Sequence, residues 1–304
     1  HSHQEIKNIL MEKYIQYNNY VIKREEIVKK LGDIAVEAMI FEAATSPSFG
    51  LVSPLTQGSH DDMDFFTFLK SSFAIKEGFE KMARVAYSYL TLEKAFLRTR
   101  KIGIETEKSM FEVTENINTH KGMIFLLGIA VVTASRVLYE GASFNDIQPM
   151  IKYMCKDILK DFENLKNKTE LTHGEKLYKN YGFTGVRGEV REGLDIIFNG
   201  SLNILEDSIK KNNDMNLASL QTLIFLMGKV MDSTIVHRHD IHMLRRVKRE
   251  AEEFFAAGGV YSELGRQTAE NMEKIYIKER ISPGGSADLL AVTIFLYKIK
   301  NLFF

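Results

Sequence analysis

Prolines occur at only four positions of the 304-residue chain, namely 47, 54, 149 and 283, so long stretches contain no residue that forces a helix to end. Apolar residues recur in these stretches at helical spacing. Leu217, Leu220, Ile224 and Met227, for example, follow one another every three or four residues, as on one buried helical face. No convincing strand alternation or hairpin signal occurs. The sequence therefore predicts an all-α protein.

We expect helices at about 4–44, 62–80, 81–98, 104–112, 120–139, 144–165, 189–211, 216–232, 238–257, 261–279 and 285–301. Polar segments that contain glycine or other small residues lie between them, at 45–61, 114–122, 172–188, 232–240 and 281–288. Each also carries titratable residues, so we expect these segments to converge on one site formed by loops and helix N-termini. No internal repeat or linker divides the chain. Residues 4–304 are therefore expected to form a single-domain multi-helix bundle, one all-α catalytic domain.

The charge balance excludes several classes of protein. Lys and Arg number 40 and Asp and Glu number 40, so the bulk positive charge that nucleic acid or an anionic membrane attracts is missing. The longest apolar run, 123–134, is shorter than the roughly 20 residues of a membrane span and indicates a buried helix. Cys155 is the single cysteine, which excludes an intramolecular disulfide and fits a reducing cytoplasm. Residues 1–3 look like a remnant of an expression tag.

An acidic cluster follows Gly58 in the sequence Gly-Ser-His-Asp-Asp-Met-Asp. We interpret Asp62 and Asp64 as a Mg²⁺-binding pair, because this cation typically uses one or two carboxylates together with substrate phosphates. His60 is a further possible site residue. Asp61 has a simpler explanation, since an aspartate near a helix N-terminus is favoured by capping and by the helix dipole.

The segment 116–122 comes directly before the apolar helix. Free N–H groups at a helix N-terminus attract phosphate, and Lys121 adds a positive charge there, so Asn118, Thr119 and Lys121 are candidate phosphate ligands. The alternative is a simple cap, formed by Asn118 or Thr119, with His120 exposed to solvent.

Two further segments have the same character. Arg187 and Glu189 supply a cation and a carboxylate around two glycines, although a surface ion pair at a helix start explains them equally well. Another candidate anion-binding helix start contains Ser282, Gly284, Gly285 and Ser286, with Asp288 in its first turn. A plain turn and N-cap is the alternative there.

The segment 232–240 begins with Asp232, a possible site residue, and ends in His239-Asp240, the kind of dyad that metal-dependent phosphohydrolases use. Such two-residue motifs are common by chance. We therefore interpret His237 and His239 as polar residues satisfied at a helix start rather than as metal ligands.

Taken together, these segments resemble the triphosphoribosyl-dephospho-coenzyme-A synthase family, which makes the prosthetic-group precursor of citrate lyase or malonate decarboxylase. The strings Asn-Thr-His-Lys-Gly at 118–122 and Ser-Pro-Gly-Gly-Ser-Ala-Asp-Leu-Leu-Ala at 282–291 carry the resemblance most specifically. Corroborating stretches are 50–52, 58–64, 100–110 and 174–189, and together they cover roughly residues 37 to 300. The chain departs from the family pattern at 48–53, 116–117 and 239–240.

The resemblance implies an all-α fold and a Mg²⁺-dependent transfer of the 5-triphosphoribosyl group of ATP to 3′-dephospho-CoA, with release of adenine. It implies Glu189 and His120 as catalytic residues and Glu189 as the base that takes the proton of the attacking hydroxyl. Mg²⁺ on Asp62 and Asp64 would neutralise the triphosphate, and Lys121 and Arg187 would bind it. The product would pass to an acyl-carrier-protein transferase, and a homodimer is possible.

Two other classes of function stay open from the residues. A Mg²⁺-dependent helical nucleotide hydrolase, similar to ADP-ribosylglycohydrolases or His-Asp phosphohydrolases, would use His239, Asp240 and the acidic cluster, with water as the acceptor. A non-catalytic helical binding protein is the other alternative. Incubation with ATP, Mg²⁺ and dephospho-CoA distinguishes the three by coupled adenine release, hydrolysis without the acceptor, or no reaction.

Overall fold

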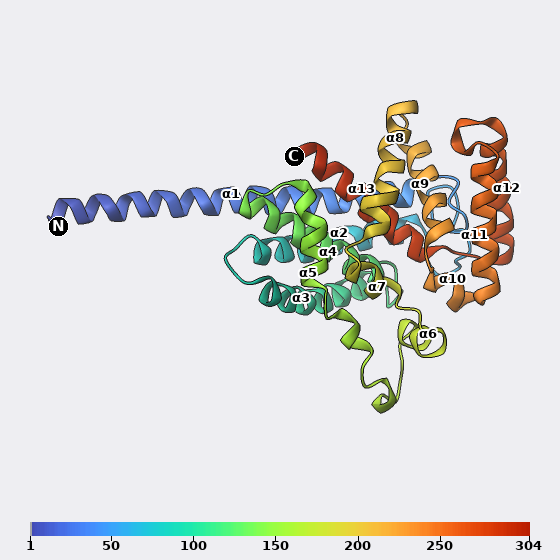
Figure 1. The fold of residues 1–304 in the computed structure, drawn as a ribbon, viewed down its shortest axis with the longest axis horizontal. Coiled ribbons are helices and arrows are strands. Elements are labelled where there is room, and N and C mark those ends of the chain that lie inside the picture. Colours follow the sequence, from blue (N-terminus) through green and yellow to red (C-terminus); the bar gives the residue numbers. More distant parts are fainter. Residues whose placement is uncertain (1) are drawn as a thin grey trace.

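The computed structural model describes residues 2–304, and these residues form helices without a β-strand (Figure 1). The prediction of an all-α protein is confirmed. The α-helices are α1 (His3–Ala44), α2 (Phe65–Ala86), α3 (Leu92–Val113), α4 (Lys121–Glu140), α5 (Ile147–Met154), α6 (His173–Tyr181), α7 (Gly185–Arg191), α8 (Leu202–Asn212), α9 (Met215–Lys229), α10 (Ser233–Arg238), α11 (Ile241–Ala256), α12 (Glu263–Glu279) and α13 (Gly284–Phe303). Short 3₁₀ turns at Phe144–Asp146, Ile158–Phe162, Leu165–Asn167 and Gly259–Tyr261, and a π-helical turn at Ile197–Ser201, complete the order.

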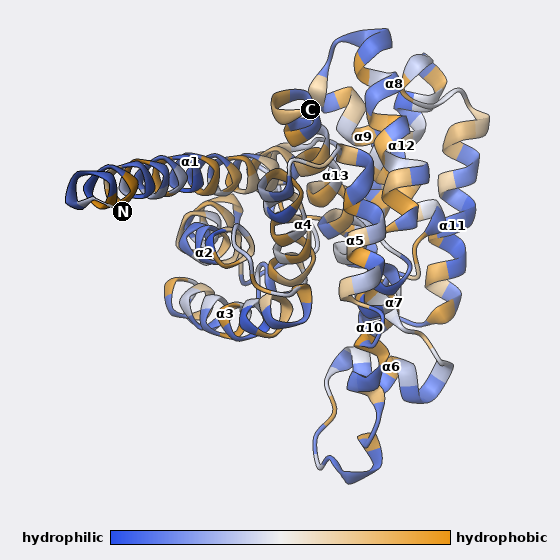
Figure 2. Cartoon of the chain, turned by 60° about the vertical axis from the view of Figure 1, so that its left-hand side comes forward, coloured by the Kyte–Doolittle hydropathy of each residue, from blue (hydrophilic) through white to orange (hydrophobic). Residues whose placement is uncertain are grey.

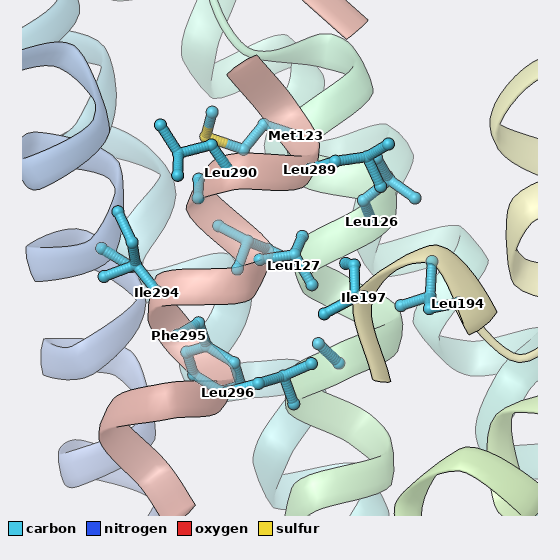
Figure 3. Close-up of a cluster of buried hydrophobic side chains, with 14 of the residues drawn as sticks. Met123, Leu126, Leu127, Leu194, Ile197, Leu289, Leu290, Ile294, Phe295 and Leu296 are labelled. Atoms are coloured by element: carbon cyan, nitrogen blue, oxygen red, sulfur yellow. The ribbon is translucent and has the colours of Figure 1, made fainter. Parts of the chain in front are cut away.

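Helices α4 and α13 form the centre of the hydrophobic core, because both are apolar around most of their circumference. Figure 3 shows Met123 of α4 beside Leu290 of α13, and Leu127 of α4 between α13 and Ile197 of the π-helical turn. By length and composition α4 is apolar enough to cross a membrane, but 78% of that apolar window is buried inside the protein. The apolar run is therefore a core helix, as predicted.

Helix α1 extends far beyond the rest of the molecule. Its N-terminal half projects into solvent, whereas its C-terminal half packs on α2 and α13 (Figures 1 and 2). No residue of α1 is buried before Ile27. Large exposed apolar side chains on the projecting half are Ile6, Ile9, Leu10, Met11, Tyr14, Ile15, Tyr17 and Ile22. Of this half, Tyr20 packs against the core and donates to the Tyr87 carbonyl at 2.7 Å, whereas the exposed apolar side chains do not reach the core.

Helix boundaries differ from the prediction where side chains, rather than apolar periodicity, determine them. The predicted helix at 81–98 is interrupted between α2 and α3, because Thr91 caps α3 by accepting a hydrogen bond from the Lys94 amide. Helix α6 forms inside the predicted loop 172–188, because Thr172 and Glu175 make a capping box and Gly182 ends the helix in the left-handed conformation.

Two predicted long helices are also broken. The segment 144–165 turns after Met154 into a series of 3₁₀ turns, and the segment 189–211 is interrupted at Gly193 and Leu194, which both have positive φ. These breaks separate α7 from α8 and leave α7 as a short element beside the N-termini of α4 and α13.

Candidate active site

The polar segments predicted to converge do come together, around the N-terminus of α13. Ser59 reaches it from the first segment, where its hydroxyl donates to the carbonyl of Ile281 at 2.6 Å. Gly122 lies so close to Asp288 that a Cβ at this glycine would collide with the Asp288 carboxylate. The start of α7 and the residues around Met231 line one cavity together with Gly285. The segments therefore lie together around one helix N-terminus, although they border two cavities rather than one.

Asp232 occupies the N-terminus of α13. Its carboxylate accepts hydrogen bonds from the Gly285 amide at 3.1 Å and from the amide and hydroxyl of Ser286, both at 2.9 Å. The same carboxylate caps α10 through the amides of Thr234 and Ile235. We expected an anion at this helix start, and there is one, but it is a side chain of the protein. These amides are therefore not free for a substrate phosphate.

The burial of Asp232, which is 1% exposed, raises its pKa, and the hydrogen bonds from Ser286 and Gly285 counteract part of that effect. Ser282 also has an internal partner, since its hydroxyl lies 2.9 Å from Nε2 of His60. Burial and the nearby Arg238 lower the pKa of His60 to about 4, so its imidazole is neutral at pH 7. The predicted phosphate ligands of this segment thus form a structural junction.

Two glycines allow the segment 45–61 to approach that junction. Gly50 has a φ of +82°, and a Cβ there would collide with the carbonyl oxygen of Ile281. Gly58 has a φ of +62° and lies against the Gly50 carbonyl. Arg238 fixes the segment from α10 by donating to the carbonyl of Ser59 at 2.8 Å.

The N-terminus of α4 has the contacts of a cap, and its lysine stays accessible. Asn118 Oδ1 accepts from the Lys121 amide at 3.1 Å, so Asn118 is a capping residue. Thr119 is hydrogen bonded to Ser71 of α2 at 2.6 Å. The Lys121 side chain is half exposed, and its nearest acidic partner is Glu107 of α3, at 3.9 Å. Lys121 is therefore accessible at the surface of a cavity.

His120 is not exposed to solvent, contrary to the simple-cap alternative. It is 1% exposed because α2 covers it: Nδ1 lies 2.6 Å from Ser71 Oγ, and the ring packs edge-on against Phe68. Burial lowers its pKa to about 3. Its Nε2 is buried and has no partner among residues 2–304. His120 lines neither of the cavities described below, so its catalytic role stays a prediction.

The three neighbouring aspartates have different surroundings. Asp61 forms an exposed ion pair with Arg280 at 2.7 Å, which explains its lowered pKa. Asp64 caps α2, with Oδ1 accepting from the amide and hydroxyl of Thr67 at 3.0 Å, and these bonds lower its pKa. Asp62 is exposed, and its side chain makes no hydrogen bond or ion pair within residues 2–304. The capping role expected of Asp61 thus belongs to Asp64, and Asp61 instead forms a surface ion pair.

Helix α7 carries the remaining candidates. Arg187 donates to Asp161 at 2.9 Å, and Arg100 of α3 forms a two-bond pair with the same carboxylate. Glu189 is half-buried; burial raises its pKa, and the charges of Asp195 and Glu192 add to the effect. A raised pKa brings a carboxylate closer to the range in which it acts as a general base at neutral pH.

Two cavities lie on either side of α7, and Val186 lines both. The first, of about 250 Å³, lies between α3, α4 and α7 and carries Arg100, Glu107, Lys121 and Arg187 on its surface. The second, of about 350 Å³, is lined by Glu189, Arg191, Ser233 and Gly285. Lys121 thus faces the first cavity and Glu189 the second.

Sequence reasoning missed Glu42, Glu107 and Arg100. Glu42 of α1 is 6% exposed, its side chain has no hydrogen bond or ion pair within residues 2–304, and it faces the charge of Asp288. Burial raises the pKa values of both carboxyls well above their ordinary range. A glutamate in the otherwise apolar stretch 38–44 was the signal that could have revealed Glu42. For Glu107 and Arg100 the only signal was their place within the family-like stretch 100–110.

The His-Asp dyad has no catalytic geometry. Asp240 caps α11 through the Met243 amide at 2.8 Å, and Nε2 of His239 lies 3.0 Å from the Arg280 carbonyl. His237 packs against His173. Within residues 2–304, no group of three or more His, Cys, Asp or Glu side chains is placed to hold a metal. His239 is thus hydrogen bonded as a structural residue, in agreement with its interpretation, and the hydrolase alternative loses its dyad.

Known proteins similar to this chain point to one activity. A family model described as ATP:dephospho-CoA triphosphoribosyl transferase matches residues 28–303. A probable 2-(5''-triphosphoribosyl)-3'-dephosphocoenzyme-A synthase of Photobacterium profundum is 33% identical over 299 residues, which are 93% of this chain and 94% of the relative. The protein of the same name from Lactiplantibacillus plantarum is 35% identical over 86% of this chain and 94% of its own length.

A third protein with this name, from Streptococcus mutans serotype c, is 30% identical over 92% of this chain and over its own full length. No solved structure gives a significant match. Because the family model and the relatives each span most of the chain, the resemblance inferred from the motifs is confirmed. The chain belongs to the ATP:dephospho-CoA triphosphoribosyl transferase family.

Proposed function

We propose that this chain transfers the 5-triphosphoribosyl group of ATP to 3′-dephospho-CoA at the two cavities beside α7. The observation that carries the assignment is that the two sides of this short helix carry different chemical groups. Cations gather at the first cavity, and a half-buried carboxylate with a raised pKa faces the second. A transfer between two large anionic substrates requires such adjoining spaces.

The chemistry is a substitution at the anomeric carbon of the ATP ribose. The bond from this carbon to adenine breaks, a bond to a ribose hydroxyl of dephospho-CoA forms, and the hydroxyl proton goes to a base. Glu189 is the base in this proposal, because its raised pKa favours proton uptake. Positive charge develops on the ribose ring as adenine leaves, and a nearby carboxylate stabilises that charge.

The triphosphate binds at the α4 N-terminus in this proposal. Lys121 is half exposed and its partner Glu107 is 3.9 Å away, so a phosphate competes for it easily. Arg187 and Arg100 already share Asp161 and add positive charge at the same cavity. His120 and Ser71 act indirectly, by holding the α4 N-terminus against α2.

Magnesium would be held by Asp62, with Asp64 contributing the carboxylate oxygen that does not cap α2. Two carboxylates fit this ion, which takes most of its remaining ligands from water and substrate phosphates. When bound, Mg²⁺ supplies charge neutralisation for the triphosphate. Asp64 holds the acidic segment at the N-terminus of α2 by capping this helix, and the helix dipole favours negative charge there.

The decisive experiment incubates the full chain with ATP and Mg²⁺, with or without dephospho-CoA, and analyses the products by mass spectrometry. We expect adenine release that depends on dephospho-CoA and a product that retains all the phosphates. Glu189→Gln should lower turnover by about 100-fold or more, whereas Glu163→Gln, at an exposed glutamate that lines neither cavity, should be neutral. Release of ADP or pyrophosphate as the main product would refute the proposal.

The cellular context follows from the same proposal. The product would serve as the prosthetic-group precursor for citrate lyase or malonate decarboxylase and would pass to an acyl-carrier-protein transferase in the cytoplasm. The exposed apolar side chains on the projecting half of α1 support a homodimer. Sedimentation of the full chain and of an α1 variant with Leu10 and Tyr14 replaced by glutamate tests that association.

A further inference from the structure

The first cavity has a composition that its phosphate-binding role does not explain. Away from its charged residues it is lined by Phe96, Phe125, Ile104, Ile124 and Val186, with Gly103 opening its wall on α3. Apolar side chains do not help to bind phosphate. They do help to bind an aromatic ring, because the free energy of transferring the faces of the ring from water to an apolar surface is favourable.

We propose that this cavity binds the adenine ring of a substrate nucleotide, with Glu107 accepting a hydrogen bond from the exocyclic amine and Lys121 binding the attached phosphates. The inference rests on the proposed function, in which both substrates are adenine nucleotides. It goes further by assigning a base-specific pocket and Glu107 as its specificity residue.

The size of the cavity agrees with a ring rather than a whole nucleotide. Pockets that bury most of a drug-sized ligand measure roughly 300–1,000 Å³, and this one measures about 250 Å³. The ring would therefore be buried while the ribose and phosphates extend past the rim. Lys121 lies at the start of α4, half exposed, where the phosphates would emerge.

The polar group inside the cavity also fits adenine. Burial raises the pKa of Glu107, and the ion pair with Lys121 lowers it. A carboxylate only accepts hydrogen bonds, so it matches the amine of adenine and repels the carbonyl oxygen that replaces this amine in hypoxanthine. The Glu107 side chain makes no other hydrogen bond or ion pair within residues 2–304, so it is accessible to a ligand.

Gly103 permits a test that separates binding from folding. A Cβ at this position would meet only the Met82 side chain, at 3.9 Å, which is ordinary van der Waals contact, and the rest of a larger side chain would occupy the cavity that Gly103 lines. Replacement of a helical glycine also favours the helix. Gly103→Leu should therefore fold with unchanged or higher melting temperature while filling the base pocket. Gly103→Ala is the matched control, since it changes helix propensity but adds little volume.

The binding experiment uses calorimetry with ATP and dephospho-CoA separately, together with steady-state KM values for each. Gly103→Leu should weaken one of the two substrates by at least about tenfold, and which one is affected identifies the source of the ring. Triphosphate without a base should bind wild type and Gly103→Leu equally. If both nucleotides keep wild-type affinity and KM in a folded Gly103→Leu variant, the cavity does not hold the base and the inference is wrong.

The specificity experiment uses whichever substrate Gly103→Leu weakens and compares it with its hypoxanthine counterpart, inosine triphosphate for ATP or the inosine analogue of dephospho-CoA. Wild type should prefer the adenine nucleotide, and Glu107→Gln should reduce that preference because an amide can donate to the carbonyl of hypoxanthine. Glu105→Gln, on the exposed side of α3, should leave the preference unchanged. An unchanged preference in Glu107→Gln would contradict the role of Glu107. Wild-type transfer activity in the same assay distinguishes this failure from failure of the proposed function itself.

Discussion

Removal of the Asp232 carboxylate should destabilise this protein more than removal of any ordinary helix cap. The carboxylate accepts five hydrogen bonds of 2.9–3.4 Å, from Thr234, Ile235, Gly285 and Ser286, and serves the N-termini of α10 and α13 together. One N-cap contributes about 0.5–2 kcal/mol, and a buried donor left without a partner costs about 1–3 kcal/mol. Because water can enter the space and satisfy some donors, we expect Asp232→Ala to lower the free energy of unfolding by about 3–5 kcal/mol.

The measurement is urea-induced unfolding, with the slope of the transition checked for constancy. Asp240→Ala is the matched control, because Asp240 is close in sequence and caps α11 alone through one bond to Met243. It should cost about 1 kcal/mol. Asp232→Asn, which keeps one acceptor oxygen, should fall between the two. If Asp232→Ala costs no more than Asp240→Ala, the carboxylate does not hold the two helices together.

Further predictions concern the α4 N-terminus and the acidic segment. Lys121→Ala should reduce ATP affinity by at least about tenfold in calorimetry. The free energy of unfolding should change by less than about 1 kcal/mol, because the Lys121 ion pair is half exposed. Unchanged ATP affinity would mean that Lys121 is only a solvated residue at the helix cap. Asp62→Asn should abolish turnover at ordinary Mg²⁺ concentrations, and Asp64→Asn should impair turnover while the asparagine still caps α2. Asp61→Asn should stay active. Loss of turnover in Asp61→Asn alone would contradict the assignment of the metal to Asp62 and Asp64. The lowered pKa of His120, about 3, means that the folded protein binds this proton less readily than the unfolded chain, so stability should fall as the pH drops below about 6.5, by up to about 1.4 kcal/mol per pH unit. His60, whose pKa is lowered to about 4, adds to the same dependence, so His120→Gln should reduce the slope in thermal unfolding from pH 7 to pH 5 without abolishing it, and an unaltered slope would place the titration elsewhere.

The sequence alone determined the helical class and the central core. A long apolar run between polar, glycine-bearing segments is buried in almost any fold. The boundaries and the burial of α4 and α13 could therefore be predicted closely. Local caps decided the remaining boundaries. The capping box of Thr172 and Glu175 was legible in the sequence, but apolar periodicity outweighed it in the prediction, and α6 was missed.

The motifs also determined the family and the segments that meet at the site, because small and charged residues beside helix starts favour anion binding regardless of the fold. The sequence could not determine which anion occupies each helix start. Asp232 lies more than fifty positions before Gly285, and only packing of α10 against α13 brings its carboxylate to the α13 amides.

Burial was likewise decided by the tertiary structure. Glu107 and His120 look like ordinary surface residues in the sequence, yet helices packed over them remove water and change their pKa values. Proton affinity depends on which groups and how much solvent surround a side chain in three dimensions, and neighbours along the chain supply few of those groups. The family was therefore readable from the motifs in the sequence, whereas the division of their residues into caps, buried groups and cavity walls required the fold.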